Sequence, residues 1–427
     1  MNYKERAYSL LKDWKKDDYL MGVGCLSEIG KRAVAFGHRA LVIANMGHIG
    51  ETVSAVIRSL ELSGIEVITG KAVKGAKNNA PLDDLYRLVA TILAYEPDLI
   101  VAIGGGSTLD VAKAANTVAT LAKENGIDVN PYFGTGKVSE SLKKEGKKLL
   151  PLIAVETVSS SGSHLTKYSN ITDMSTGQKK LIVDDAITPS LSVFDYSVTS
   201  SLPISTTLEG ILDSLSHSYE VFCGAKGEKY DKTKEVFTVC VNLLFTYSER
   251  LINNPHDAEA REAIGLASDL GGYAIMIGGT SGGHLTSFSL VDSMPHGLAC
   301  GIMNPYYTVF YSSAIEEQLK VFAEILSSYG YAEHSICGLS GRDLAEAVAK
   351  AMLRFNRTIG APVKLKDVPS FNPDIHIPRA LSAAKDDDLK MKLQNMPVPM
   401  TKDDVDEYMA PILNAAADGD LSIIKTM

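Results

Sequence analysis

Short apolar runs alternate with amphipathic helical patterns along the first half of the chain. Three five-residue runs have the length of buried strands, and the stretches between them repeat their apolar positions at the helical period of 3.6 residues. The expected strands cover 40–44, 65–69 and 99–103, and the expected helices cover 51–62 and 83–94. Such alternation predicts a parallel sheet with helices on both of its faces.

Two further apolar runs, 150–155 and 191–194, are separated by a polar stretch rich in Ser, Thr and Gly, where we expect a functional loop or hairpin. After Pro203 the pattern changes to long helices, with few β-branched runs. These helices are expected at 206–222, 233–251, 258–277 and 343–355. The sequence therefore predicts two domains, a Rossmann-like α/β domain with a parallel sheet over residues 1–200 and an all-α domain over residues 201–427.

Composition narrows the classes of function. With 427 residues, 45% of them hydrophobic, the chain is long enough to bury two cores. A formal net charge of -9 without a long Lys/Arg block argues against nucleic acid as a partner. No apolar run approaches the roughly 20 residues needed to cross a bilayer, so no membrane anchor is expected. The five cysteines are scattered without the spacing of a metal clip, which favours a reducing cytoplasm.

A glycine turn follows the third predicted strand. The run 99–103 leads directly into three glycines and a serine, and a helical pattern continues as far as Glu124. Because glycine has no Cβ, free N–H groups can approach an anion closely, and the helix start adds partial positive charge, so a pyrophosphate fits here. Ser107 is also a natural N-cap with Asp110 at position N3, so a purely structural turn is the alternative.

Four residues of the second half form a candidate metal site. Asp213 and His217 stand four residues apart in a helical run, which puts both side chains on one face; an ordinary ion pair is the alternative. His284 follows two glycines and His296 lies in a Pro-His-Gly sequence, settings that let an imidazole point inward. One carboxylate and three neutral imidazoles suit Fe(II) or Zn(II), with a position left open for a substrate oxygen or water.

The glycine turn, the Asp213 and His217 pair and the Pro-His-Gly at 295–297 together resemble the iron-containing (group III) alcohol dehydrogenase family, in order and in distance along the chain. Further similarity lies in the Ser/Thr/Gly-rich loop 156–163, at Lys180 and in the segment Gln394–Pro397. The resemblance spans nearly the whole chain. It implies the two-domain architecture that this family shares with dehydroquinate synthase.

The resemblance also implies the site residues. The domain over 1–200 would bind NAD(H) or NADP(H), and the domain over 201–427 would bind a divalent metal, Fe(II) with Zn(II) as the alternative, with the reaction in the cleft between them. The implied catalytic and metal-binding residues are Asp213, His217, His284 and His296. The implied cofactor-binding residues are Asn45, Gly104, Gly105, Gly106, Ser107, Asp110, Thr157, Val158, Ser161, Ser163 and Lys180.

Three departures from the family pattern bear on function. Asn45 stands where members that prefer NAD often carry Asp, so the choice between NAD and NADP stays open. Many members carry two histidines four residues apart near position 284, one a ligand and one proposed to relay protons, whereas this chain has only His284, two residues beyond the usual ligand position. His164 replaces the usual Glu of the polar loop.

These features predict a metal-dependent, NAD(P)-linked oxidoreductase that interconverts a small alcohol and its aldehyde or ketone by hydride transfer. One alternative is a lyase or cyclase related to dehydroquinate synthase, which uses a metal and NAD transiently. A second alternative, a non-catalytic structural member, is disfavoured because all four candidate ligands are present. We expect a cytoplasmic homodimer or larger homo-oligomer. The identity of the alcohol and the choice between iron and zinc stay open.

Overall fold

The computed structural model describes residues 2–122 and 126–427. Its contacts divide the chain into two compact units. The sheet unit takes in the described residues of 8–203 together with 256–265, and the helical unit takes in the residues up to 7, 204–255 and 266–427. The division by function that we expect near residue 200 stays a prediction.

A parallel sheet forms the centre of the sheet unit. Its strands follow the order β1-β10-β7-β5-β2-β3, with β4 also paired to β2, and every pairing is parallel. The strands are β1 (Tyr19–Gly22), β2 (Arg39–Ala44), β3 (Glu66–Val67), β4 (Val73–Lys74), β5 (Leu99–Gly104), β7 (Leu152–Glu156) and β10 (Leu191–Asp195). All six residues of β5 are buried, as expected for a strand covered on both faces.

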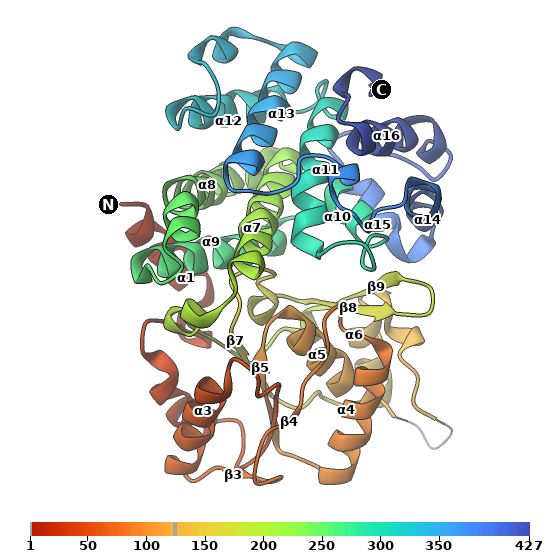
Figure 1. Cartoon of the computed structure of the whole chain (residues 1–427). Helices are drawn as coiled ribbons and strands as arrows, with labels where there is room; N and C mark the ends of the chain where they lie inside the picture. The colour runs from red at the N-terminus through yellow and green to blue at the C-terminus, as the bar shows by residue number, and fades with distance from the viewer. Residues whose placement is uncertain (1, 123–125) are drawn as a thin grey trace. The chain divides into compact units, whose positions relative to one another are not determined.

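Helices cover the two faces of this sheet. The helices of this part of the chain are α1 (Tyr3–Lys15), α2 (Ile29–Ala33), α3 (Gly50–Leu62), α4 (Leu82–Tyr95), α5 (Gly106–Thr120) and α6 (Lys137–Glu145). Alternate residues of β2 enter different cores: Leu41 packs with residues of α4 and α5, whereas Val42 packs with residues of α3 on the opposite face (Figure 1). The predicted parallel sheet with helices on both faces is confirmed.

The polar stretch between β7 and β10 contains a β-hairpin. Strands β8 (Tyr168–Asp173) and β9 (Gln178–Val183) pair antiparallel, and the short strand β6 (Gly134–Thr135) pairs with β9 in parallel. The prediction of a functional loop or hairpin here is thus confirmed in its structural part. Apolar side chains of the hairpin, Ile171 and Ile182, belong to the same core as α4 and α5, so the hairpin is tied to the glycine-turn helix.

Beyond Pro203 the described chain forms helices and no strand. The predicted all-α second part is therefore confirmed. The helices are α7 (Ile204–Gly224), α8 (Tyr230–Asn253), α9 (Ala258–Ile277), α10 (Gly282–Ser287), α11 (His296–Phe310), α12 (Glu316–Ser328), α13 (Gly341–Thr358), α14 (Pro373–Ala384), α15 (Lys390–Gln394) and α16 (Ala410–Asp418). Helix α7 packs against α8 and α11, and α11 packs against α10 (Figure 1).

The charged run 143–148 begins inside a helix, since its first three residues belong to the exposed end of α6. Glu124, the expected end of the helix after the glycine turn, lies outside the described residues, and α5 ends at Thr120.

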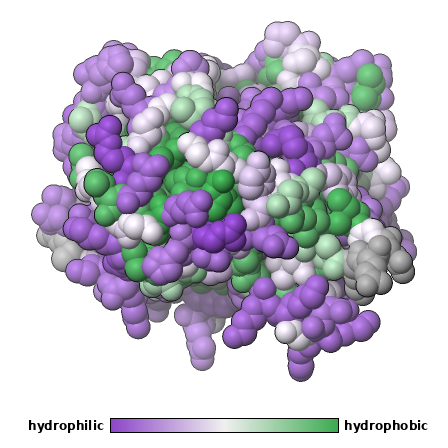
Figure 2. All heavy atoms as spheres, turned by 90° about the horizontal axis from the view of Figure 1, so that it is seen from below, coloured by the Kyte–Doolittle hydropathy of each residue, from purple (hydrophilic) through white to green (hydrophobic). Residues whose placement is uncertain are grey.

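On the face shown in Figure 2, hydrophilic side chains predominate and apolar side chains form patches between them. Among the described residues, no helix is long and apolar enough to span a bilayer.

Lys113 of α5 provides a test of how the sheet unit is held together. Its buried ammonium donates to the carbonyl oxygens of Ser163 (2.6 Å), Thr166 (2.9 Å) and Tyr168 (2.8 Å). Replacing Lys113 by Met leaves these acceptors without their donor, so we expect a loss of roughly 3 kcal/mol in the free energy of unfolding, measured in urea. The exposed Lys148 is the control, since Lys148→Met is expected to change it by less than about 0.5 kcal/mol. Equal stability of the two variants would contradict this account.

Candidate metal and cofactor site

Helix α7 carries the first two candidate metal ligands. Asp213 and His217 are one turn apart, so both project from the same face of the helix, and both are buried. The Nε2 atom of His217 lies 3.7 Å from Oδ1 of Asp213, and its Nδ1 atom has no hydrogen-bond partner among the described residues. The pair does not lie on a solvated surface, so the simple surface ion pair that the sequence left open is excluded.

Helices α10 and α11 bring two more imidazoles to the same carboxylate oxygen. Nε2 of His284 lies 3.7 Å from Oδ1 of Asp213, and Nε2 of His296 lies 3.8 Å from it. The Nδ1 atom of His296 is engaged by the hydroxyl of Ser287 at 2.9 Å. The rings of His217 and His284 are stacked with their centroids 4.6 Å apart. All four residues predicted from the sequence are therefore within one cluster.

Sequence reasoning missed two members of this cluster. Cys300 lies one turn after His296 on α11, and its Sγ atom is 4.0 Å from Nε2 of His296. Asp213, His284, His296 and Cys300 each offer a possible ligand atom, and these four atoms lie within 4.8 Å of one another. Glu220 lies on α7, seven residues after Asp213, and bonds Nδ1 of His284 at 2.8 Å. Both carry a readable signal, because spacings of four and seven residues put side chains on one helix face.

Electrostatics favour an ionised Asp213 carboxylate beside a neutral His217 ring and a neutral Cys300 thiol. Burial works against the charge on Asp213, but the neighbouring imidazoles hold the pKa of this carboxyl well below its usual range. Burial lowers the pKa of His217 to about 4, so its ring is neutral at pH 7. Burial raises the pKa of the Cys300 thiol, which keeps it protonated. Burial opposes the charge on His284, but the carboxylates of Glu220 and Asp213 raise the pKa of its ring well above the usual range, so a bound metal would displace a proton there.

The donor set fits a divalent metal. Nε2 of His284 is buried and has no hydrogen-bond partner among the described residues, as expected of a nitrogen that faces an ion. Two donors bound at about 2.1 Å to one tetrahedral ion lie roughly 3.4 Å apart, and the three imidazoles lie only a few tenths of an ångström farther than that from Asp213. One carboxylate and three imidazoles are ligands that iron and zinc accept.

The glycine turn joins β5 to α5 in the sheet unit. The helix begins at Gly106 with Gly105 as its N-cap, so the expectation that Ser107 is the N-cap was wrong, and Ser107 lies inside the first turn. A Cβ on Gly105 would lie 2.9 Å from the side chain of Val158, and one on Gly106 would lie 2.5 Å from Oγ of Ser161. The loop after β7 is therefore packed directly against the turn, and only glycine allows this approach.

Asp110 and Ser163 hold that loop in place. Oδ1 of Asp110 accepts from the hydroxyl of Ser163 at 2.6 Å, and Oδ2 accepts from the backbone N–H of Asn170 at 2.9 Å. Both residues are buried. The structure thus gives Asp110 a bonding partner other than the helix start that the sequence suggested. Whether Asp110 and Ser163 also contact the cofactor stays a prediction.

The remaining predicted cofactor residues lie around the same turn or at the ends of strands. Thr157 and Val158 donate their backbone N–H groups to Oε1 of Glu156, the last residue of β7. The ammonium of Lys180, on β9, lies 5.4 Å from the ring centre of Phe133. Asn45 follows β2, is exposed, and donates its side-chain amide to the carbonyl oxygen of Ala76 at 2.7 Å. Their contacts to a cofactor stay predictions.

His164, noted from the sequence as unusual, is fully buried in the sheet unit. Its Nδ1 atom lies 3.2 Å from Oε2 of Glu156, and its Nε2 atom lies 3.3 Å from the hydroxyl of Tyr19. Its ring also packs edge-on against Phe194. His164 therefore links strands β1, β7 and β10 from within the core.

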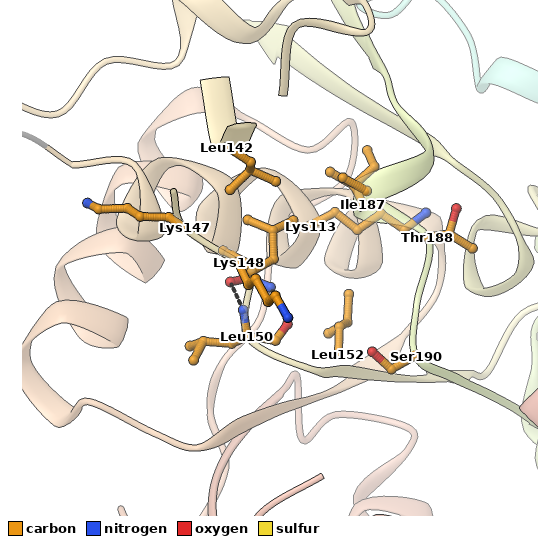
Figure 3. A pocket seen from close by; sticks show the side chains of 12 residues that line it. Lys113, Leu142, Lys147, Lys148, Leu150, Leu152, Ile187, Thr188 and Ser190 are labelled. Carbon is orange, nitrogen blue, oxygen red and sulfur yellow. Dashed lines mark hydrogen bonds between the residues drawn. The ribbon is translucent and has the colours of Figure 1, made fainter. Parts of the chain in front are cut away.

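A pocket of about 260 Å³ lies elsewhere in the sheet unit (Figure 3). None of the predicted cofactor residues lines it. Its twelve lining residues are Lys113, Asn116, Leu142, Lys147, Lys148, Leu149, Leu150, Leu152, Ala186, Ile187, Thr188 and Ser190. The ammonium of Lys113 is already bonded to backbone carbonyls, and that of Lys147 donates to the carbonyl of Thr120 at 2.9 Å. This pocket is separate from the glycine turn.

Family models match nearly the whole chain, one in each half of the sequence. The family model of the iron-containing alcohol dehydrogenases matches residues 17–196, and the model of the C-terminal part of the Fe-containing alcohol dehydrogenase family matches residues 207–413. The chain belongs to the iron-containing alcohol dehydrogenase family. The prediction of a metal-dependent, NAD(P)-linked alcohol oxidoreductase is confirmed at the level of this family, and neither the lyase nor the non-catalytic alternative is supported.

Individual members of the iron-containing alcohol dehydrogenase family are similar over most of the chain. The NAD-dependent methanol dehydrogenase of Bacillus methanolicus is 27% identical over 364 residues, which cover 84% of this chain and 89% of that protein. The NADPH-dependent butanol dehydrogenase of Clostridium saccharobutylicum is 24% identical, over 82% and 84% of the two chains. The solved alcohol dehydrogenase from Oenococcus oeni shares the fold, with a TM-score of 0.77 at 24% identity, covering 93% of this chain and 97% of that chain.

The close packing at Gly106 tests the cofactor role of the glycine turn. In Gly106→Ala the new methyl group meets Ser161 at 2.5 Å, so the loop must move away from the turn. We expect the KM for the nicotinamide cofactor to rise about tenfold or more, a loss of at least about 1.4 kcal/mol in binding. The control is Gly338→Ala, since a Cβ at Gly338 meets nothing within 4 Å. An unchanged KM in Gly106→Ala would remove the turn from the cofactor site.

Proposed function

We propose that this chain interconverts a small aldehyde and its primary alcohol with a nicotinamide cofactor bound at the glycine turn and a divalent metal bound by Asp213, His217, His284 and His296. The observation that carries the proposal is the convergence of three Nε2 atoms on one carboxylate oxygen, at 3.7 to 3.8 Å. Asp213, His217 and His284 are buried, and His296 is partly exposed. No surface salt bridge requires such an arrangement, whereas a metal with nitrogen and oxygen ligands does.

Each group has a part in the reaction. When bound, the metal supplies Lewis-acid polarisation of the substrate oxygen and the nicotinamide supplies or accepts the hydride. Asp213 contributes one negative charge, which reduces a divalent ion to a formal charge near +1. His217, His284 and His296 each offer an Nε2 nitrogen to the metal, and the burial of His217 and His284 keeps water away from Asp213. The amide groups at the start of α5 are available for a pyrophosphate.

Small alcohols are the substrates that the relatives favour. Their names include methanol, butanol and 1,3-propanediol dehydrogenases, of which the first is called NAD-dependent and the second NADPH-dependent. Both cofactors are therefore candidates here. At Asn45 an exposed neutral side chain follows β2, and it repels a 2'-phosphate less than an aspartate would. We propose that NADPH is accepted beside NADH.

We assign the metal to the four nitrogen and oxygen ligands and not to Cys300. A thiol binds a metal as the thiolate, and burial raises the pKa of Cys300. Fe(II) is the metal we would supply first, with Zn(II) as the alternative. We also propose a cytoplasmic homo-oligomer; all five cysteines are free thiols, which suits a reducing compartment.

The decisive experiment combines metal removal with a single substitution. The protein is purified without oxygen, stripped with a chelator and restored with Fe(II) or Zn(II), and the oxidation of NADH and NADPH is followed with a panel of short aldehydes. We expect activity to disappear on stripping and return with metal. Asp213→Asn should bind no stoichiometric metal by elemental analysis and should lose at least about 1,000-fold in kcat, since one ligand charge is removed. Full activity in stripped protein would refute the proposal.

The role of Cys300 has its own test. Because the thiol is protonated and not assigned as a ligand, Cys300→Ser should keep one metal per chain and change kcat by less than about threefold, or about 0.7 kcal/mol. Cobalt-substituted protein provides the spectroscopic check, since a thiolate ligand gives a strong charge-transfer band that the four nitrogen and oxygen ligands lack. Such a band in the parent protein, lost in Cys300→Ser, would place Cys300 among the ligands.

A further inference from the structure

Glu220 is a buried carboxylate with hydrogen bonds to two residues of the helical unit. Its Oε1 atom lies 2.8 Å from Nδ1 of His284, and its Oε2 atom accepts from the backbone N–H of Ser281 at 2.6 Å. The hydroxyl of Ser281 lies 3.3 Å from the same Oε2 atom. The carboxylate thus holds both the imidazole and the backbone just before α10.

These bonds determine which nitrogen of His284 is free. A carboxylate accepts hydrogen bonds, so the hydrogen of a neutral ring facing Glu220 lies on Nδ1. The lone pair is then on Nε2, the atom 3.7 Å from Oδ1 of Asp213 that has no hydrogen-bond partner among the described residues. A carboxylate that fixes the tautomer in this way orients a metal-binding imidazole and raises its basicity.

A buried lysine balances the charge of Glu220. The ammonium of Lys392, on α15, interacts electrostatically with Glu220, is hydrogen-bonded to the hydroxyl of Thr280, and lies 5.5 Å from the ring centre of Phe288. Asn395 donates to the carbonyl oxygen of the same Thr280 at 3.3 Å. Residue 280 and the start of α10 are thus held on one side by α15 and on the other by Glu220.

The glycine before His284 permits this arrangement. A Cβ at Gly283 would lie 2.6 Å from Oε1 of Glu220 and 2.6 Å from Oδ1 of Asn304. Any other residue would push the carboxylate off the imidazole. In the sequence, His284 lies two residues beyond the usual ligand position of the family. The structure shows that the glycine directly before it is needed for close packing against Glu220.

We propose that Glu220 is a positioning residue that keeps Nε2 of His284 directed at the metal. The proposal rests on the proposed metal site. Glu220 does not touch the substrate or the cofactor in this account, and it acts only through His284. Its removal should therefore weaken metal binding before it affects any other property of the enzyme.

The test measures metal affinity in the full-length protein. Stripped parent, Glu220→Gln and Glu220→Asp are titrated with Co(II) and with Zn(II) against a competing chromophoric chelator. Gln removes the charge but keeps the length, whereas Asp keeps the charge but is one methylene too short to reach Nδ1. We expect both variants to bind about 10- to 100-fold more weakly, and the visible spectrum of the Co(II) form to change because one ligand is no longer held in place.

Glu346→Gln is the matched control, because it removes a carboxylate from an ion pair with Arg342 on α13 of the same unit. Parent-like affinity and an unchanged Co(II) spectrum in both Glu220 variants would overturn the inference. A parent protein that binds no metal would instead refute the proposed function, and the inference with it. If neither variant folds, ring-nitrogen NMR of the Zn(II)-loaded parent decides: a proton on Nδ1 of His284 supports the inference, and one on Nε2 overturns it.

Discussion

A carboxylate buried within the helical unit is the constraint on which the rest of the site depends. Asp213 is 1% exposed, and an isolated ion at such a position costs on the order of several kcal/mol. Its compensation comes from three imidazoles on α7, α10 and α11, so these helices must approach one another closely enough for ring nitrogens to reach one oxygen atom. The close packing of these three helices is therefore required both for the stability of the buried carboxylate and for the geometry of the site.

Glycines make that approach possible. A Cβ on Gly297, directly after His296, would lie 2.1 Å from the carbonyl oxygen of Glu209 and 2.9 Å from Cβ of Asp213. One turn later on α11, a Cβ on Gly301 would lie 2.9 Å from the side chain of Leu212. The glycine of the Pro-His-Gly sequence thus allows α11 to lie against the backbone of α7. The same sequence places His296 beside Asp213, with Nε2 3.8 Å from Oδ1 of the carboxylate.

The features that the sequence predicts correctly are those determined by residues close together in the chain. Features that depend on contacts between distant residues were missed. The doubly covered sheet, the long helices and the four side chains of the proposed metal site follow from local periodicity and motif, and the structure contains the sheet and the helices and brings the four side chains together. Strand β1 could not be foreseen, because Tyr19–Gly22 is short and becomes a strand only by pairing with β10, over 160 positions away. Asp110 was placed wrongly at a helix cap because its real partners, Ser163 and Asn170, are more than 50 positions away.

Charged residues that do not bind the metal also affect the net charge of the proposed site. Glu220 and Lys392 are two such residues. If Glu220 stood alone, two buried carboxylates would cancel the charge of a divalent ion and leave little to polarise a substrate oxygen. The positive charge of Lys392 offsets that of Glu220, so in the proposed site Asp213 would set the charge that a bound metal retains, near +1. A hydrogen-bond acceptor for His284 is thereby obtained without loss of Lewis acidity. This combination requires residues from α7 and α15, about 170 positions apart, which explains why no local motif announces it.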